Sequence, residues 1–275
     1  MSAACDDHTT VFQDEHVAPP RHSSGVVPVT ALTQAERGAM LSLMHEHYQG
    51  VRDDVFAAEL AEKEAVVMLR RGNQVIGFST LKVAHSYVGS IPVTAFFSGD
   101  TIVEAQAQGY SELARLWGRH VFAHAATTRA HEPARRVFWL LISAGYKTYR
   151  FLPLFFRRFL PAHDRPADPF DALAANTLAE QRYGTSYDAA SGVVRLPHPT
   201  PLRPGVAEPS AARRRDPHVA FFLAANPGHA RGDELVCLTE LHPDNLTRAG
   251  RRMVGFPTDP ASSSALAPGD PDAAR

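Results

Sequence analysis

A β-hairpin is predicted in the first third of the 275-residue chain, and it requires a β-sheet in the fold. Residues 65–69 and 75–81 are two runs of strand length that are rich in Val and other apolar residues. Between them, Arg71-Gly72-Asn73-Gln74 contains the Gly and Asn residues that are typical of a tight turn. A further strand is predicted over residues 92–103, with a bulge or a bend at Gly99-Asp100.

Two helices are predicted ahead of this hairpin. Thr33 and Glu36 have the spacing of a capping box, in which side-chain oxygens accept hydrogen bonds from the free backbone amides at a helix start. Apolar residues then recur at helical spacing over 40–47, and Gly50 is a typical C-terminal stop. A second amphipathic helix is predicted over about 51–63.

Helices and strands alternate after the hairpin. The predicted order is a helix at about 110–120, a strand at about 121–127, a helix at 133–143 and a strand at 146–154. Such alternation around a hairpin predicts an α/β protein with a mixed sheet.

The sequence also predicts how the chain is divided. Residues 1–25 are expected to be a disordered leader, 26–160 the main domain, 161–256 an extension packing on it, and 257–275 a disordered tail. The Pro- and Ala-rich extension is predicted to contain a helix at 170–183 and strands at 192–196, 219–223 and 234–238.

Composition argues against several classes of protein. The formal net charge is −1 and the pI is about 6.9, so no overall field attracts nucleic acid. Apolar segments are interrupted well short of the roughly 18 residues of a membrane span, and the first 24 residues lack the apolar run of a signal peptide. Two cysteines, Cys5 and Cys237, make neither a disulfide framework nor a thiolate metal site. With the histidines scattered, at His120, His124 and His131, no metal is expected, and a cytoplasmic location is predicted.

Three segments resemble the GCN5-related N-acetyltransferase (GNAT) superfamily. They are Gln-Val-Ile-Gly-Phe-Ser-Thr at 74–80, Ser-Gly-Asp-Thr-Ile-Val-Glu at 98–104 and Leu-Leu-Ile-Ser-Ala-Gly-Tyr at 140–146. With the order of elements, the resemblance covers about residues 30–155. It implies a GNAT-like acyl-CoA N-acyltransferase fold, in which the fourth strand splays from its neighbour and acetyl-CoA or another acyl thioester lies in the gap. It also implies transfer to an amine, with a small-molecule acceptor or an acyl carrier protein as partner.

The resemblance further implies which residues bind the thioester. The strand backbone at Thr101, Ile102 and Val103 would pair with the pantetheine arm. In the next loop, backbone amides of this family hold the pyrophosphate at a helix N-terminus, where the helix dipole favours an anion. That loop corresponds here to Gln108-Gly109-Tyr110-Ser111-Glu112-Leu113. Ser111 and Leu113 replace small residues of the family and Glu112 adds a negative charge, so the loop has another conformation, the donor is not acetyl-CoA, or the site is inactive.

Acyl transfer to an amine requires a base for the amine and benefits from an acid for the leaving group. Glu104, at the end of the splayed strand, is one candidate base and Asp100 is the other; strand alternation places both on one face unless a bulge intervenes. The position of the family's general-acid tyrosine corresponds to Leu141 in this chain. Tyr146 and Tyr149 on the following predicted strand are therefore the candidate acids.

Two further segments have open interpretations. Residues 149–160 hold five Phe or Tyr residues and three arginines without an acidic side chain. They fit either a core strand with an amphipathic cover, or a peripheral membrane or acyl-chain contact. The polar loop 226–233 fits either a site or a plain turn. Three functions follow: an N-acyltransferase, an inactive GNAT-like binding or structural protein, and a synthase of long-chain acyl-amino-acid type.

Overall fold

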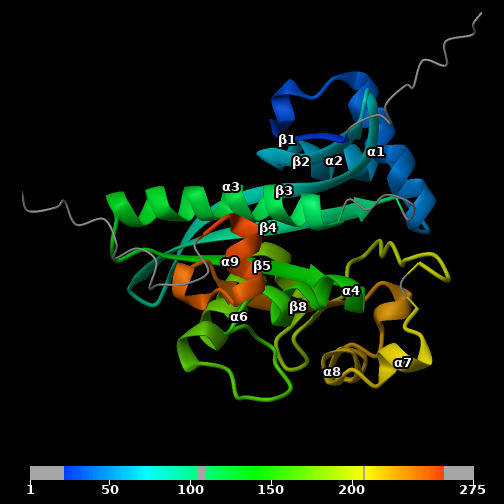
Figure 1. The fold of residues 1–275 in the computed structure, drawn as a ribbon. Coiled ribbons are helices and arrows are strands. Elements are labelled where there is room, and N and C mark those ends of the chain that lie inside the picture. The colour runs from blue at the N-terminus through cyan, green and yellow to red at the C-terminus, as the bar shows by residue number, and fades with distance from the viewer. Residues whose placement is uncertain (1–21, 105–109, 207, 257–275) are drawn as a thin grey trace, which may run out of the picture.

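A computed structural model of the protein describes residues 22–104, 110–206 and 208–256. These residues form one eight-stranded sheet with the order β1-β2-β3-β4-β5-β8-β7-β6 (Figure 1). The strands are β1 His22–Pro28, β2 Ala65–Arg71, β3 Gln74–Val88, β4 Ile91–Val103, β5 Arg136–Ser143, β6 Tyr187–Asp188, β7 Val193–Val194 and β8 Glu234–Glu240. Among the described strands, β4 and β5 are the one pair that runs in parallel, so the predicted α/β class with a mixed sheet is confirmed.

Helices cover both faces of this sheet. The helices are α1 Gln34–His47, α2 Asp53–Ala61, α3 Tyr110–His131, α4 Tyr146–Tyr149, α5 Phe151–Phe155, α6 Pro169–Tyr183, α7 Ala211–Arg214, α8 Pro217–Ala225 and α9 Arg248–Val254. Short 3₁₀ turns cover Val29–Ala31, Gly184–Ser186, His229–Arg231 and Pro243–Asn245. Helix α3 packs on one face of the sheet, together with α5, α8 and α9 (Figure 1). Helices α1, α2 and α6 pack on the opposite face.

The first half of the fold follows local sequence signals. Strands β2 and β3 form the predicted hairpin, and its Gly72 has a φ of 57°, which favours glycine. The predicted capping box opens α1, with Thr33 Oγ1 accepting from the Glu36 amide at 3.2 Å. Between β3 and β4, Gly99 and Asp100 stand opposite the single residue Thr80, which is the predicted bulge.

The predicted helix at 110–120 is confirmed as the first half of α3, but the elements predicted between residues 121 and 154 are wrong. The predicted helix 110–120 and strand 121–127 are one helix, α3, because Val121, Phe122 and Ala125 lie at helical spacing and all pack toward the sheet. The predicted helix 133–143 is strand β5. Its apolar run is buried on both faces, and such a run does not by periodicity alone distinguish a buried strand from a buried helix. The predicted strand 146–154 is the helix pair α4 and α5.

The C-terminal extension supplies strands to the same sheet. Helix α6 confirms the predicted helix 170–183, and β8 confirms the predicted strand 234–238. The predicted strand 219–223 is instead helix α8, while β7 is a short part of predicted strand 192–196. Strand β8 pairs with β5, so residues 161–256 extend the sheet as well as covering it.

The predicted ends of the chain lie mostly outside the described residues. Residues 22–25 form part of β1 and not of a leader, because they pair with β2. Residues 1–21 and 257–275 are not among those the structure describes. Among the described helices, none combines the length and the apolar character needed to cross a membrane.

Candidate functional site

Strands β4 and β5 part in the middle of the sheet. They pair in parallel from Val93 and Arg136 up to Ser98 and Leu141. Beyond that point β4 stays with β3, and β5 stays with β8. Successive backbone groups of a strand alternate between its two neighbours, so the part of β4 after Ser98 presents N–H and C=O groups to the opening. The splay implied by the family resemblance is therefore present.

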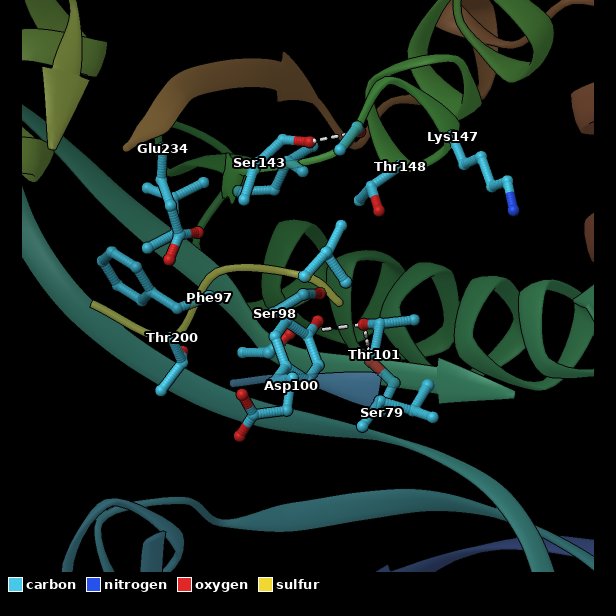
Figure 2. A pocket seen from close by; sticks show the side chains of 18 of the residues that line it. Ser79, Phe97, Ser98, Asp100, Thr101, Ser143, Lys147, Thr148, Thr200 and Glu234 are labelled. Carbon is cyan, nitrogen blue, oxygen red and sulfur yellow. Dashed lines mark hydrogen bonds between the residues drawn. The ribbon is translucent and has the colours of Figure 1, made fainter. Parts of the chain in front are cut away.

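A cavity of about 910 Å³ follows this opening (Figure 2). Residues 97–102 of β4 and 141–143 of β5 line it, together with side chains of α1, α2 and α6 from one face and of α3, α5 and α9 from the other. Its volume lies within the range of about 300–1,000 Å³ that is usual for small-molecule sites.

Carboxyl side chains gather where the cavity reaches the α2 and α6 face. Glu59 comes from α2, Asp100 from the β4 bulge and Glu234 from the first residue of β8. Figure 2 shows the carboxyl groups of Asp100 and Glu234 on the same side of the cavity, near Thr200. We call Glu59, Asp100 and Glu234 the carboxyl cluster.

Burial and charge repulsion make Asp100 and Glu234 reluctant to ionise. Burial raises the pKa of Glu234 to about 8, and the charges of Asp100 and Glu59 add to the effect. The pKa of Asp100 is raised to about 6 by burial and by Glu59, against the opposing charge of Lys63. Within the described residues, neither Asp100 nor Glu234 forms an ion pair at 4 Å or less. Both carboxyl groups therefore titrate near neutral pH and face an open cavity.

Lys63 is a cation beside the carboxyl cluster. It lines the cavity, and burial lowers the pKa of its ammonium group while Asp100 opposes that change. A side chain at Gly99 would have its Cβ at 3.4 Å from Lys63 Nζ and in collision with Thr80 Oγ1. Glycine at this bulge therefore leaves room for Lys63 to approach the backbone of β4.

The cavity wall on the α3 face has the opposite chemistry. Trp117 of α3 and Trp139 of β5 lie with ring centroids 4.2 Å apart. Their indole N–H groups donate to the same Ser98 Oγ, at 3.1 and 2.9 Å. The split thus separates this aromatic wall from the carboxyl cluster.

The predicted residues on β4 divide between the cavity and its surroundings. Asp100, Thr101 and Ile102 line the cavity, and the Thr101 hydroxyl donates to Gly99 O at 3.3 Å. Val103 is buried in the hydrophobic core on the α3 face. Glu104 lies outside the lining and accepts from Gln74 Nε2 at 3.4 Å.

Only part of the predicted phosphate loop lies among the described residues. Gln108 and Gly109 lie outside the described residues, and Tyr110 is the first residue of α3. Ser111 is exposed. Glu112 accepts a hydrogen bond from the Ser24 hydroxyl of β1, so its carboxylate has a structural partner.

The two predicted acid tyrosines lie on α4 and not on a strand, and both are outside the lining of the cavity. The Tyr149 hydroxyl donates to Pro161 O at 2.9 Å, and its ring packs against Phe159 and Phe222. Burial raises the pKa of Tyr149, away from the range of an acid at neutral pH. Leu141, to which the resemblance had assigned the family's tyrosine, lies on β5 and lines the cavity.

Tyr149→Phe is expected to lower the free energy of unfolding by about 1 kcal/mol, because it removes a buried hydrogen bond to Pro161 O and keeps the ring. Equilibrium urea unfolding measures this change. The rate of acyl transfer should remain within about a factor of two of the wild-type rate, because the ring stays in place. A loss of activity without a loss of stability would show that the hydroxyl reaches the reacting atoms.

The structure shows where residues 149–160 and 226–233 lie relative to the cavity. In 149–160, Phe151, Leu154 and Phe155 of α5 line the cavity, and Leu154 is 52% exposed. In the loop 226–233, the buried Asn226 amide donates to Ser143 O at 3.3 Å and to Asp233 O at 2.7 Å. These two hydrogen bonds connect the end of β5 to the residue before β8, the strand that carries Glu234.

Glu59, Lys63 and Glu234 were not predicted as site residues. Each lies in a helix, at a helix end or in a strand without a local motif, and Glu234 is more than a hundred residues from Asp100 in the chain. Among the described residues, no group of three or more His, Cys, Asp or Glu side chains is arranged to hold a metal ion.

No protein-family model matches the chain, and no curated protein matches it. Solved structures match it in part. A conserved protein of unknown function from Enterococcus faecalis V583, described as a probable N-acyltransferase, has 12% identity and a TM-score of 0.36, covering 50% of this chain and 33% of that one. An aminoglycoside N-acetyltransferase in complex with CoA has 15% identity and a TM-score of 0.33, covering 49% and 86%.

An acetyltransferase from Trypanosoma brucei has 15% identity and a TM-score of 0.35, covering 54% of this chain and 98% of that one. The chain thus spans about a third of the length of the Enterococcus faecalis protein and most of the other two. All three matches have identities of 12–15% and cover about half of this chain.

Proposed function

We propose that the protein is an N-acyltransferase that moves an acyl group from a thioester donor, acyl-CoA or an acyl carrier protein, to an amine. The observation that carries this proposal is the parting of β4 and β5 after Ser98 and Leu141, within a cavity that also holds ionisable carboxyl groups. A pantetheine arm is an extended chain with two amides, so it suits the unpaired edge of β4 as an added strand would.

The two faces of the split support different parts of the reaction. The thioester carbonyl would lie near Ser98, where backbone N–H groups of the open β4 edge can stabilise the developing oxyanion. The amine would approach from the face of the carboxyl cluster. Its nitrogen attacks the carbonyl carbon, the C–S bond breaks, and the proton of the amine passes to a carboxylate.

Asp100 and Glu234 suit the role of that base. A general base works best when its pKa lies near the working pH, and the values of about 6 and about 8 bracket neutrality. The leaving thiol has an ordinary pKa of about 8.5, so it departs as a thiolate without a dedicated acid. The proposal therefore does not require Tyr146 or Tyr149, which lie outside the cavity lining.

Donor binding and turnover can be tested separately. Acetyl-CoA, longer acyl-CoAs and acyl carrier thioesters are added to the full chain, and the melting temperature is measured. A donor at a hundred times its Kd should stabilise the fold by about 2.7 kcal/mol. A panel of primary amines is then added, and thiol release and the mass of the amide product are followed.

Amide formation with at least one donor and amine is the expected result. If no thioester raises the melting temperature and no thiol is released, the proposed function is wrong. Stabilisation without thiol release for any amine would instead assign this fold a role in binding thioesters.

A further inference from the structure

Apolar and aromatic side chains form the cavity wall on the α3 face. We define the apolar wall as Leu113, Ala114, Trp117, Trp139, Phe155 and Met253, which come from α3, β5, α5 and α9. All except Phe155 are buried residues of the main hydrophobic core, with exposed fractions of 8% or less. The cavity thus enters the core of the protein.

An opening into a core is costly unless something occupies it. Protein interiors are packed as densely as organic crystals, and lining atoms without a partner lose their dispersion contacts. The cost grows with cavity volume, at about 24 cal/mol per Å³ in measured cases. Water gains little on such a wall, because it needs polar partners there. An apolar ligand is the occupant that recovers these contacts.

The polar atoms at the edge of the apolar wall are already engaged. The N–H groups of Trp117 and Trp139 both donate to Ser98 Oγ. Neither indole is therefore available to bind an amide of a pantetheine arm, which suits the open edge of β4 better. What the wall offers is aromatic and aliphatic surface, and this favours hydrocarbon.

Ser98 links the wall to the reacting atoms. It is the last residue of β4 that pairs with β5, and its hydroxyl holds both indoles of the wall. A thioester carbonyl at the split would therefore have its acyl carbons next to Trp117 and Trp139. The carboxyl cluster lies on the other face, where the amine would approach.

We infer that the donor carries an acyl chain longer than acetyl, whose hydrocarbon lies on the apolar wall. This inference rests on the proposed function and specifies its donor. It also gives a role to α5, whose Phe155 is on the wall and whose Leu154 lines the same cavity.

The test is a series of donors that differ only in chain length. The Kd values of CoA and of acetyl-, butyryl-, hexanoyl-, octanoyl- and decanoyl-CoA are measured by titration calorimetry, below the concentrations at which the longer thioesters form micelles. The same acyl series on phosphopantetheine covers a carrier-protein donor. Affinity should rise by about fourfold for each methylene that becomes buried, up to a limiting length.

Two variants of the wall should change this dependence in opposite directions. Ala114→Phe fills the wall, so affinity should no longer rise with acyl length beyond acetyl. Met253→Ala opens the wall, so the limiting length should increase. Ala126→Phe is the matched control, because Ala126 is an exposed alanine on the same helix, and it should leave the length dependence unchanged.

The outcomes separate this inference from the proposal on which it rests. Donors that bind equally at all lengths, or a length dependence that neither Ala114→Phe nor Met253→Ala alters, would overturn the inference and leave the transferase proposal standing. If neither CoA nor any thioester of either series binds, the proposed function fails and the inference fails with it.

Discussion

Replacing Asp100 by Asn is expected to lower kcat/KM for acyl transfer by roughly 10²–10⁴-fold, the usual contribution of a general base. Asn has almost the same shape and cannot accept the proton of the amine. Asp100 lies at the bulge where β4 leaves β5, next to the position of the thioester in the proposed reaction. Initial rates of thiol release with a fixed donor and amine measure the effect.

The pH profile gives this substitution a second readout. In the wild type, kcat/KM should rise with pH as the carboxyl groups ionise, through a range set by pKa values of about 6 and about 8. The charge of Asp100 is one of the causes that raise the pKa of Glu234, so its removal should move the upper limb of the profile to lower pH. This shift tests the coupling between the two carboxyl groups, and the loss of kcat/KM tests Asp100 as the base.

Asp53→Asn is the matched control for this experiment. Asp53 is the first residue of α2, its side chain is 70% exposed, and its ion pair with His45 lies outside the cavity lining. This control should leave both the rate and the pH profile unchanged. An Asp100→Asn protein that is folded and transfers acyl groups at the wild-type rate would exclude Asp100 as the base.

Glu234→Gln is expected to stabilise the protein at pH 8 by on the order of 2 kcal/mol while slowing acyl transfer. The folded-state pKa of Glu234 is about 8, above the ordinary value of a glutamate. The folded protein therefore holds this proton more tightly than the unfolded chain does. The stability that this proton contributes is fully present below the pKa of Glu234 in the unfolded chain. It is lost as the pH rises through the pKa of Glu234 in the folded protein.

Urea unfolding between pH 4.5 and pH 8.5 measures this effect. The wild-type free energy of unfolding should receive a falling contribution from Glu234 across that window, and Glu234→Gln should remove it. A substitution that stabilises a fold and impairs its reaction is the pattern expected of a strained functional group. Equal slopes in wild type and variant would show that Glu234 is well solvated.

Glu36→Gln provides a control of opposite sign. Hydrogen bonds from the Thr33 backbone and from Arg70 lower the pKa of Glu36. Its contribution to stability is therefore present above the unfolded pKa and is lost as pH falls. This variant should be less stable than the wild type at neutral pH, so the two glutamines distinguish a carboxylate that the fold holds ionised from one that it holds protonated.

Short-range signals in the sequence were sufficient for the first half of the fold. The turn at Gly72, the capping box at Thr33 and the bulge at Gly99-Asp100 each depend on a few neighbouring residues, and each is confirmed. The splay of β4 from β5 was reached through the family resemblance, and the strand pairing contains it. Asp100 was also a candidate base, because its position depends on β4 alone.

The segment 110–154 shows where such signals are insufficient. In α3, the residues around Val121 and Phe122 have branched and aromatic side chains that also suit a strand, and packing across the sheet selects the helix. In β5, an apolar run of six residues packs on both faces of the sheet, so its periodicity carries no information. Placing these elements wrongly also put Tyr146 and Tyr149 on a strand and near the reaction.

What the sequence alone determined was the sheet class, the hairpin, the β4 strand with its bulge and one carboxyl group of the cluster. The grouping of Glu59 and Glu234 with Asp100 follows from the packing of α2 and β8 on the sheet and has no signal in the local sequence. The tertiary structure also decided that Glu104 lies outside the cavity. The physical reason is that hydrogen bonds and turn geometry act between neighbours in the chain, whereas burial and charge repulsion act between neighbours in space.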